Sequence, residues 1–259
     1  LVLMALLMPA SRDLLAPFKT HFWSLIILSL LGVTVGYLVF HWSLDFASVP
    51  QVATTVTTIP IFVALGNLVI NRQPIGRAKI IGGLCAVGGI ALLITDGYLA
   101  RLAGSGSNLF GIFLAMGCAA AVALYSLLVR PIVAEYGALR ITAITMMLGG
   151  LGLWLLVGVT FNVWALPQRL IDLPAAGLGY LLVIAFWNTT ITQFLWIGGL
   201  AAVPDITRGS YLFFLKPVIA ALLAVWILNQ DITWVQMLAI AVVCASVFGE
   251  ILLTRKPAK

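Results

Sequence analysis

The sequence predicts an all-α polytopic membrane protein, and three observations support that prediction. The chain of 259 residues is 63% hydrophobic and 8% charged, whereas soluble domains carry about 25% charged residues. Its apolar residues gather in runs close to the length of about 20 residues that a membrane-spanning helix needs. Short connections marked by Pro, Gly, Asn and Asp separate these runs. Water cannot solvate a surface with so few charges, so most of it must face lipid.

Eight full spans are expected, after an apolar remnant at 1–8. They lie near residues 22–44, 52–70, 78–95, 109–129, 139–161, 175–200, 209–228 and 233–253. The chain opens at Leu1 inside an apolar run, so we expect that its natural N-terminus is missing. The comparatively polar connection at 96–108 marks a seam between two halves, 1–103 and 104–259.

Basic residues indicate how the spans are oriented, because short loops rich in Lys and Arg stay in the cytoplasm. In the best orientation, eleven of the 14 Lys and Arg residues fall on one side, and only Arg101 and Arg169 fall on the other. The remaining cation, Lys216, lies inside a span. We therefore expect a multi-pass membrane protein with its C-terminus in the cytoplasm.

The two halves resemble one another in sequence. "FHWSLDFASVP" (40–50) aligns with "FLWIGGLAAVP" (194–204). After a three-residue insertion, Pro60 aligns with Pro217 and Gln73 with Gln230. The matched segments therefore run through two spans of each half.

The matched loops of the two halves differ in their content of basic residues. The loop 71–79 holds three basic residues and its counterpart 229–236 holds none, whereas "AVPDITR" (202–208) contains Arg208 and "ASVPQ" (47–51) is uncharged. Equivalent loops thus lie on opposite sides of the membrane. An inverted repeat of this kind is typical of alternating-access transporters with a site near the bilayer midplane. It requires an odd number of helices per half, and the second half has five. We therefore expect that one whole helix and part of the next precede Leu1.

These residues resemble the EamA family of the drug/metabolite transporter superfamily. The resemblance rests on "ASVPQVATTVTTIPIFVAL" and "AAVPDITRGSYLFFLKPVIAALLAV", each with a proline in mid-helix. It implies ten helices in two inverted five-helix repeats and a place in the bacterial inner membrane. The aromatic segments "GYLVFHW" and "YLFFLKP" look most like the YddG-type exporters of aromatic amino acids, which implies export. Where the fourth helix of each repeat ends, the family often has an acidic residue, and this chain has Arg72 and Asn229.

Lys216 is the leading candidate for substrate binding. It lies about eight residues, or roughly 12 Å, into its helix. Its ammonium either snorkels to the interface or faces a wet cavity, and ionisable groups inside a membrane are functional by default. A single deep cation suits a carboxylate, whereas a diphosphate usually calls for several Arg or Lys donors. An amino acid is therefore favoured over a nucleotide sugar.

Further candidates surround this cation in the predicted site. Asn188, Thr192 and Gln193 form the polar centre of a span and either bond neighbouring helices or line a cavity. The other expected substrate-binding residues are Tyr37, His41, Tyr125, Tyr211, Phe213 and Trp187, for each of which helix packing or an interfacial position is the alternative. Pro60 and Pro217 are expected hinges, although membrane helices also tolerate prolines that have no function.

The residue census excludes several classes of function. The chain has no HExxH, no GxSxG and no paired intramembrane acids, so catalytic residues, metal sites and cofactors are not expected. No basic cluster predicts nucleic-acid binding, and a purely structural scaffold leaves Lys216 unexplained. The expected partners are the lipid bilayer and a small-molecule substrate, and we expect a monomer. The sequence therefore favours an exporter of aromatic or hydrophobic amino acids, with exchange of nucleotide sugars or phosphorylated metabolites as the alternative.

Overall fold

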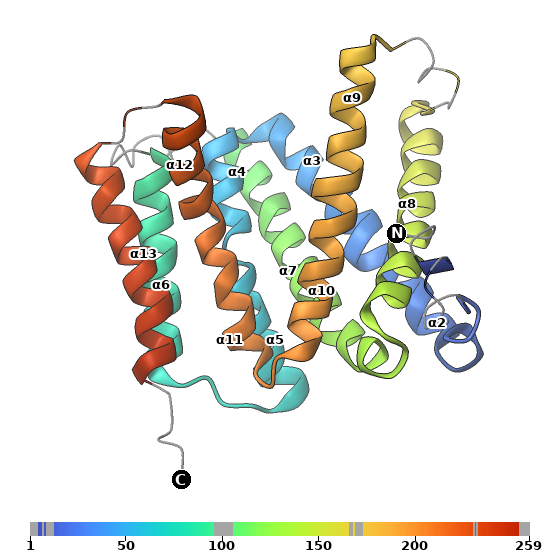
Figure 1. Ribbon diagram of the computed structural model, residues 1–259, viewed down its shortest axis with the longest axis horizontal. Helices are drawn as coiled ribbons and strands as arrows, with labels where there is room; N and C mark the ends of the chain where they lie inside the picture. The colour runs from blue at the N-terminus through green and yellow to red at the C-terminus, as the bar shows by residue number, and fades with distance from the viewer. Residues whose placement is uncertain are drawn as a thin grey trace. The chain divides into compact units, whose positions relative to one another are not determined.

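The computed structural model describes residues 5–6, 8, 13–95, 106–165, 168, 173–229, 231 and 233–253. Every regular element within these ranges is helical (Figure 1). The helices, in chain order, are α2 (Phe18–Ser29), η2 (Leu30–Val35), α3 (Gly36–Phe46), α4 (Val49–Val56), α5 (Ile59–Asn71), α6 (Arg77–Thr95), α7 (Gly106–Tyr136), α8 (Ala138–Phe161), α9 (Ala175–Val183), η5 (Ile184–Ile191), α10 (Thr192–Ala202), α11 (Ile206–Ser210), η6 (Tyr211–Phe214), α12 (Leu215–Leu228) and α13 (Trp234–Leu253).

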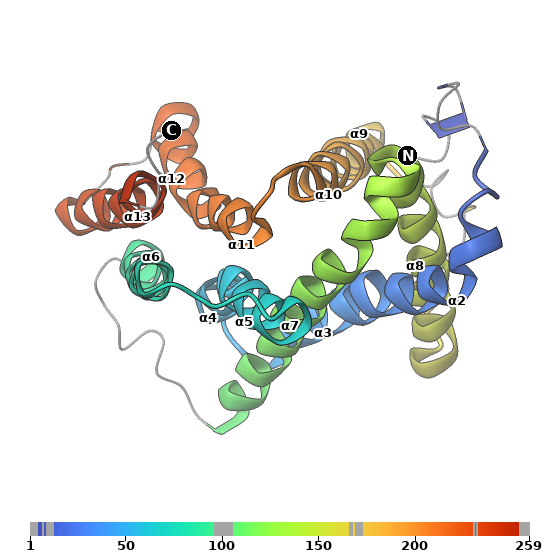
Figure 2. The same ribbon diagram turned by 90° about the horizontal axis from the view of Figure 1, so that it is seen from below.

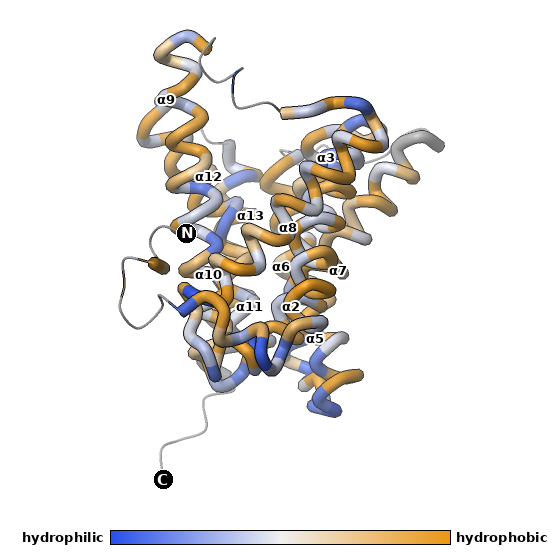
Figure 3. The backbone as a smooth tube through the Cα atoms, turned by 90° about the vertical axis from the view of Figure 1, so that its right-hand side faces the viewer, coloured by the Kyte–Doolittle hydropathy of each residue, from blue (hydrophilic) through white to orange (hydrophobic). Residues whose placement is uncertain are grey.

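Within the described residues, the helices confirm seven of the eight predicted full spans, and the eighth, near 233–253, corresponds to the shorter apolar stretch in α13. Seven helical stretches are long and apolar enough to cross a membrane, and α13 is a further apolar helix. Figure 3 shows hydrophobic residues along the length of these helices. Most of the predicted remnant at 1–8, most of the seam at 96–108 and the boundary between 103 and 104 lie outside the described residues.

The described residues form two compact units. The first comprises Leu1–Leu38 with Leu128–Pro204, and the second comprises Val39–Leu127 with Asp205–Lys259. In the first unit, α8 packs on α2, η2 and α10. In the second, α6 and α13 lie side by side, as both Figure 1 and Figure 2 show, and α11 packs on α5. Each unit therefore combines segments from both halves of the sequence.

Glycine allows the helices within each unit to approach closely. In α6, a Cβ on Gly89 would lie 2.8 Å from Val243 Cγ2 of α13. In α8, a Cβ on Gly149 would lie 2.7 Å from the carbonyl oxygen of Ser29, which belongs to the backbone of α2. Thr34 Oγ1 also donates to the Gly149 carbonyl at 2.7 Å. Small residues of this kind at a contact between membrane helices let the two backbones come together.

Each expected hinge proline lies beside a break in its helix. Pro60 opens α5, and a turn at Thr57–Thr58 separates α5 from α4. Pro217 lies in the first turn of α12, directly after the 3₁₀ stretch η6. Proline has no N–H and clashes with the carbonyl four residues earlier, so a break just before it has a local cause. Whether these breaks act as hinges stays a prediction.

Two π-helical segments recur at matching positions of the aligned halves. The segment η2 begins ten residues before Phe40, and η5 begins ten residues before Phe194, which is the residue aligned with Phe40. The segments α5 and α12 also end alike, because Arg72 and Asn229 follow them with positive φ angles of 52° and 49°. The aligned halves thus share local backbone features as well as sequence.

The close approach of α8 to α2 predicts opposite effects at two adjacent glycines. Gly149→Ala should lower the free energy of unfolding by about 1–3 kcal/mol because the new methyl group meets backbone atoms. Gly150 has open space around its Cβ position, so Gly150→Ala should be neutral or stabilise by up to about 1 kcal/mol through helix propensity. Thermal unfolding of both variants in the same detergent measures the difference. Equal melting temperatures for the two variants would contradict this account of the packing.

Candidate functional site

The polar centre of the sixth span lies in the π-helical segment η5 and at the start of α10. Thr189, Thr190 and Thr192 each donate a hydroxyl hydrogen bond to the carbonyl five residues earlier, at 3.3, 3.0 and 3.0 Å. Each threonine hydroxyl is therefore bonded to the backbone of its own helix. The side chains of Trp187 and Asn188 in the same segment are exposed. π-helical turns inside α-helices occur frequently at functional sites.

Two predicted site residues of the first unit are in direct contact. Gln193 Nε2, on α10, donates to the Tyr37 hydroxyl, on α3, at 3.3 Å. Both side chains are partly buried. The sequence predicted each of them separately and did not predict the bond between them, which joins residues far apart in the chain.

Lys216 of the second unit lies within the apolar span Ile206–Ile227 and is exposed. Its Nζ lies 5.3 Å from the centroid of the Phe213 ring, one turn earlier. The break at η6 brings these two predicted site residues together at the start of α12. Such a pair can bind a ligand that has an anionic group next to a flat apolar group: the cation binds the anionic group, and the aromatic ring packs on the apolar group.

Two tyrosines predicted to line the site are buried in the second unit. Tyr211 lies in η6, and its hydroxyl donates to the backbone carbonyl of Lys79 on α6. A Cβ on Gly83 would lie 3.2 Å from that hydroxyl oxygen, so glycine there leaves the approach open. Tyr125 is buried within α7. His41 is exposed, and its ring meets Phe40 edge-on with 5.2 Å between centroids.

The predicted site residues therefore fall into two groups. The first unit holds Tyr37, Trp187, Asn188, Thr192 and Gln193, and the second unit holds His41, Tyr125, Tyr211, Phe213 and Lys216. Within the groups, the contacts between Gln193 and Tyr37 and between Lys216 and Phe213 are established. That all ten residues serve one substrate stays a prediction.

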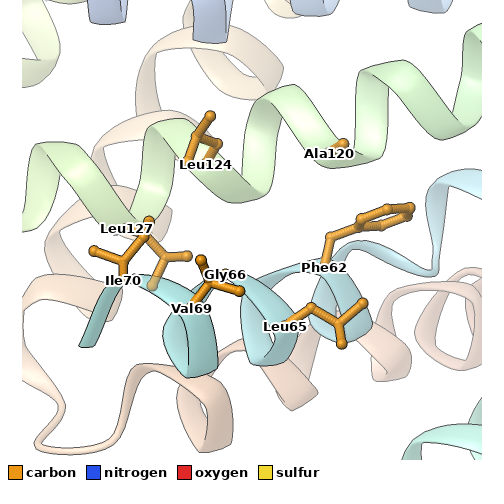
Figure 4. A pocket seen from close by; sticks show the side chains of 8 residues that line it. All are labelled: Phe62, Leu65, Gly66, Val69, Ile70, Ala120, Leu124 and Leu127. Carbon is orange, nitrogen blue, oxygen red and sulfur yellow. The ribbon is translucent and has the colours of Figure 1, made fainter. Parts of the chain in front are cut away.

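A groove in the second unit lies between α5 and α7 (Figure 4). Its volume is about 310 Å³, and its lining is apolar throughout: Phe62, Leu65, Gly66, Val69, Ile70, Ala120, Leu124 and Leu127. None of the predicted site residues lines it. The groove has no group that could bind a carboxylate or a phosphate, so it does not compete with Lys216 as a site for a charged substrate.

An ion pair that the sequence did not predict joins α6 to α11. Lys79 Nζ lies 2.5 Å from Asp205 Oδ2, and both side chains are partly buried. Asp205 is also the N-cap of α11, where its Oδ1 accepts the Arg208 N–H at 3.2 Å. Next to it, Asn67 Nδ2 on α5 donates to Thr207 Oγ1 at 3.2 Å. The only early signal was that both loops were placed on the same side of the membrane.

Partial burial alone would raise the pKa of the Asp205 carboxyl. The hydrogen bonds from the Lys79 ammonium and the Arg208 N–H, together with the charges of both residues, outweigh burial and hold this pKa below its ordinary value. The carboxylate is therefore ionised at neutral pH, as an ion pair with Lys79 requires.

Comparisons with known proteins agree with the helical architecture. The chain matches the model of the EamA-like transporter family over residues 1–95 and again over 109–251. It is 23% identical over 263 residues to the uncharacterized transporter YetK of Bacillus subtilis (strain 168), covering 99% of this chain and 76% of that protein. An uncharacterized transporter of Archaeoglobus fulgidus is 24% identical over 127 residues, covering 49% of this chain and 43% of that protein.

One solved crystal structure superimposes on 90% of this chain and 76% of its own chain, with a TM-score of 0.71 and 17% sequence identity. That similarity shows a shared fold. The two matches to the family model meet across the seam at 96–108 and together cover most of the sequence. The expectation of an all-helical transporter with inverted repeats is thereby confirmed, and the chain belongs to the EamA-like transporter family, whose members lie in the membrane as multi-pass proteins.

Proposed function

We propose that the protein exports amino acids with aromatic or hydrophobic side chains across the bacterial inner membrane by alternating access. The proposal rests on one observation above the others, which is the exposed Lys216 within an apolar span and beside the Phe213 ring. An aromatic amino acid carries the two complementary groups, a carboxylate and a flat apolar ring. The likeness of the aromatic segments to YddG-type exporters supports export as the direction.

The contact between Lys216 and Phe213 is weak enough for a substrate to replace. An exposed cation–π contact is worth about 0.5–1 kcal/mol. A hydrogen bond between two charged groups contributes about 1.5–3 kcal/mol. A substrate carboxylate therefore competes successfully for the ammonium, and the substrate side chain then packs beside the Phe213 ring.

Amides in the first unit are separate candidates for binding a substrate ammonium. The Gln193 side chain donates to Tyr37 through its nitrogen, so its oxygen is oriented away from that bond and can accept from a substrate ammonium. The exposed amide of Asn188 offers a second acceptor. An ammonium group donates hydrogen bonds, and the carbonyl oxygens of amide side chains accept them.

The proposal predicts that Lys216→Ala weakens transport of an amino acid and spares its decarboxylated analogue. Apparent affinity for phenylalanine should fall about 10- to 100-fold, because a charge-assisted bond of about 1.5–3 kcal/mol is lost. Transport of phenethylamine, which has no carboxylate, should not fall with it. Counterflow in proteoliposomes, with each variant reconstituted at equal density, measures both.

Lys19→Ala is the matched control, because Lys19 is an exposed cation at the start of α2. It should transport phenylalanine like the parent, and Lys216→Arg should keep most of the parent activity. Unchanged phenylalanine affinity in Lys216→Ala would reduce Lys216 to a snorkelling residue. Transport of nucleotide sugars but not of amino acids by the parent would favour the alternative function.

Tyr37→Phe tests the contribution of the first unit. Its hydroxyl positions the Gln193 amide, so its removal should raise the KM for phenylalanine several-fold while the melting temperature stays within a few degrees of the parent. The same proteoliposome assay and a thermal-unfolding scan report the two quantities. A lower melting temperature with an unchanged KM would mean that the bond serves helix packing alone.

A further inference from the structure

The start of α11 is tied to the neighbouring helices of the second unit at three places. Asp205 pairs with Lys79 at the start of α6, Thr207 accepts a hydrogen bond from Asn67 of α5, and Tyr211 donates to the Lys79 carbonyl. Thr207 and Tyr211 are buried. The three ties lie within seven residues, on the face of the membrane that the basic residues predict to be cytoplasmic.

The two oxygens of Asp205 have separate partners. Oδ1 accepts the Arg208 N–H and so caps α11, and Oδ2 pairs with Lys79. The local structure of α11 therefore requires only an acceptor at Oδ1, which asparagine also provides. The negative charge of Asp205 is needed only for its ion pair with Lys79, which joins α11 to α6.

The ion pair joins one residue from each half of the sequence, and the equivalent pair of positions carries no charge. The aligned counterparts of Asp205 and Lys79 are Gln51 and Gln236. Gln51 Oε1 accepts the Ser48 N–H at 2.8 Å, and Gln236 Oε1 accepts the Thr233 N–H at 3.1 Å. Each glutamine thus caps the start of its own helix. In an inverted repeat these positions lie at the opposite face of the membrane, so the ion pair distinguishes one face from the other.

We propose that Lys79 and Asp205 form a latch, which holds α11 against α6 and opens once in each transport cycle. Because α11 leads through η6 into α12, release of the latch lets α11 swing about the break that precedes Pro217. The latch biases the resting protein toward the state that is closed at the cytoplasmic face. This inference rests on membership of a transporter family and not on the identity of the substrate.

Cysteine labelling tests the latch without any substrate. In a variant lacking Cys85, Cys118 and Cys244, Ser210→Cys places a thiol on the buried face of α11. Its reaction with a membrane-impermeant maleimide is measured in inside-out vesicles. Adding Asp205→Asn should speed labelling at least fivefold, and Lys79→Gln should do the same. The double variant should label no faster than either single one, because both changes break the same ion pair.

Three controls separate the latch from general loosening of the protein. Asp45→Asn removes an exposed carboxylate of α3 and should leave labelling of Ser210→Cys unchanged. Asp205→Glu keeps the charge and should return labelling toward the parent rate. A variant with Cys118 as its single thiol, buried in α7, should label equally slowly with and without Asp205→Asn. Unchanged labelling at position 210, or an equal rise at Cys118, would overturn the proposal.

The latch should also be insensitive to pH over the physiological range. The charged residues acting on Asp205 are Lys79 and Arg208, and its pKa is held below the ordinary value. A carboxyl group with a lowered pKa stabilises the paired state above its unpaired pKa and loses that effect as the pH falls through the lowered value. The labelling rate of Ser210→Cys is divided, at each pH, by the rate of the same variant that also carries Asp205→Asn. This ratio should stay constant between about pH 5.5 and 8. A ratio that collapses within this range would contradict a pair of this kind.

Discussion

The structure depends on the requirement that each backbone donor and acceptor inside a bilayer find a partner within the protein. Long helices meet this requirement, and each departure from α-helix needs a substitute partner. Before Pro60, Thr57 and Thr58 donate hydroxyl hydrogen bonds to the carbonyls of Thr54 and Thr55, both at 2.6 Å. Before η6, Ser210 donates to the Thr207 carbonyl at 2.7 Å. The breaks therefore occur where the sequence supplies hydroxyl groups to complete them.

Features with local causes could be predicted from the sequence. Runs of apolar residues indicated eight spans, and Pro60 and Pro217 indicated where two of them break, because proline acts on its own turn of helix. The π-helical segments could not be predicted in this way. A change from α to π pairing shifts each bond by one residue and leaves composition and hydropathy unaltered, and the threonines of η5 are equally compatible with an α-helix that bonds its own backbone.

In the candidate site too, features with a local cause could be predicted from the sequence, and contacts between helices could not. Lys216 and Asn188 were predicted because polar groups are rare in apolar spans, and that signal is contained in each residue alone. The bond between Gln193 and Tyr37 and the ion pair between Lys79 and Asp205 depend on which helices are neighbours, and no pattern along the chain encodes that. Tyr211 was predicted from the sequence as a substrate-binding residue, and only the packing of η6 on α6 shows that its hydroxyl donates to the Lys79 carbonyl.

Inverted repeats alone would make the two end states of a transport cycle nearly equal in energy, since each state exchanges the roles of two similar halves. A net preference must then come from positions where the halves differ. Two such differences among the aligned helix starts lie at Asp205 and Gln51, and at Lys79 and Gln236. Charge pairs at one face and self-capping glutamines at the other have unequal interaction energies, so the two faces cannot be equally easy to open. Asp205 caps α11 directly before the span that contains Lys216, the substrate cation proposed here, so the proposed binding step and the proposed opening step share one continuous stretch of backbone.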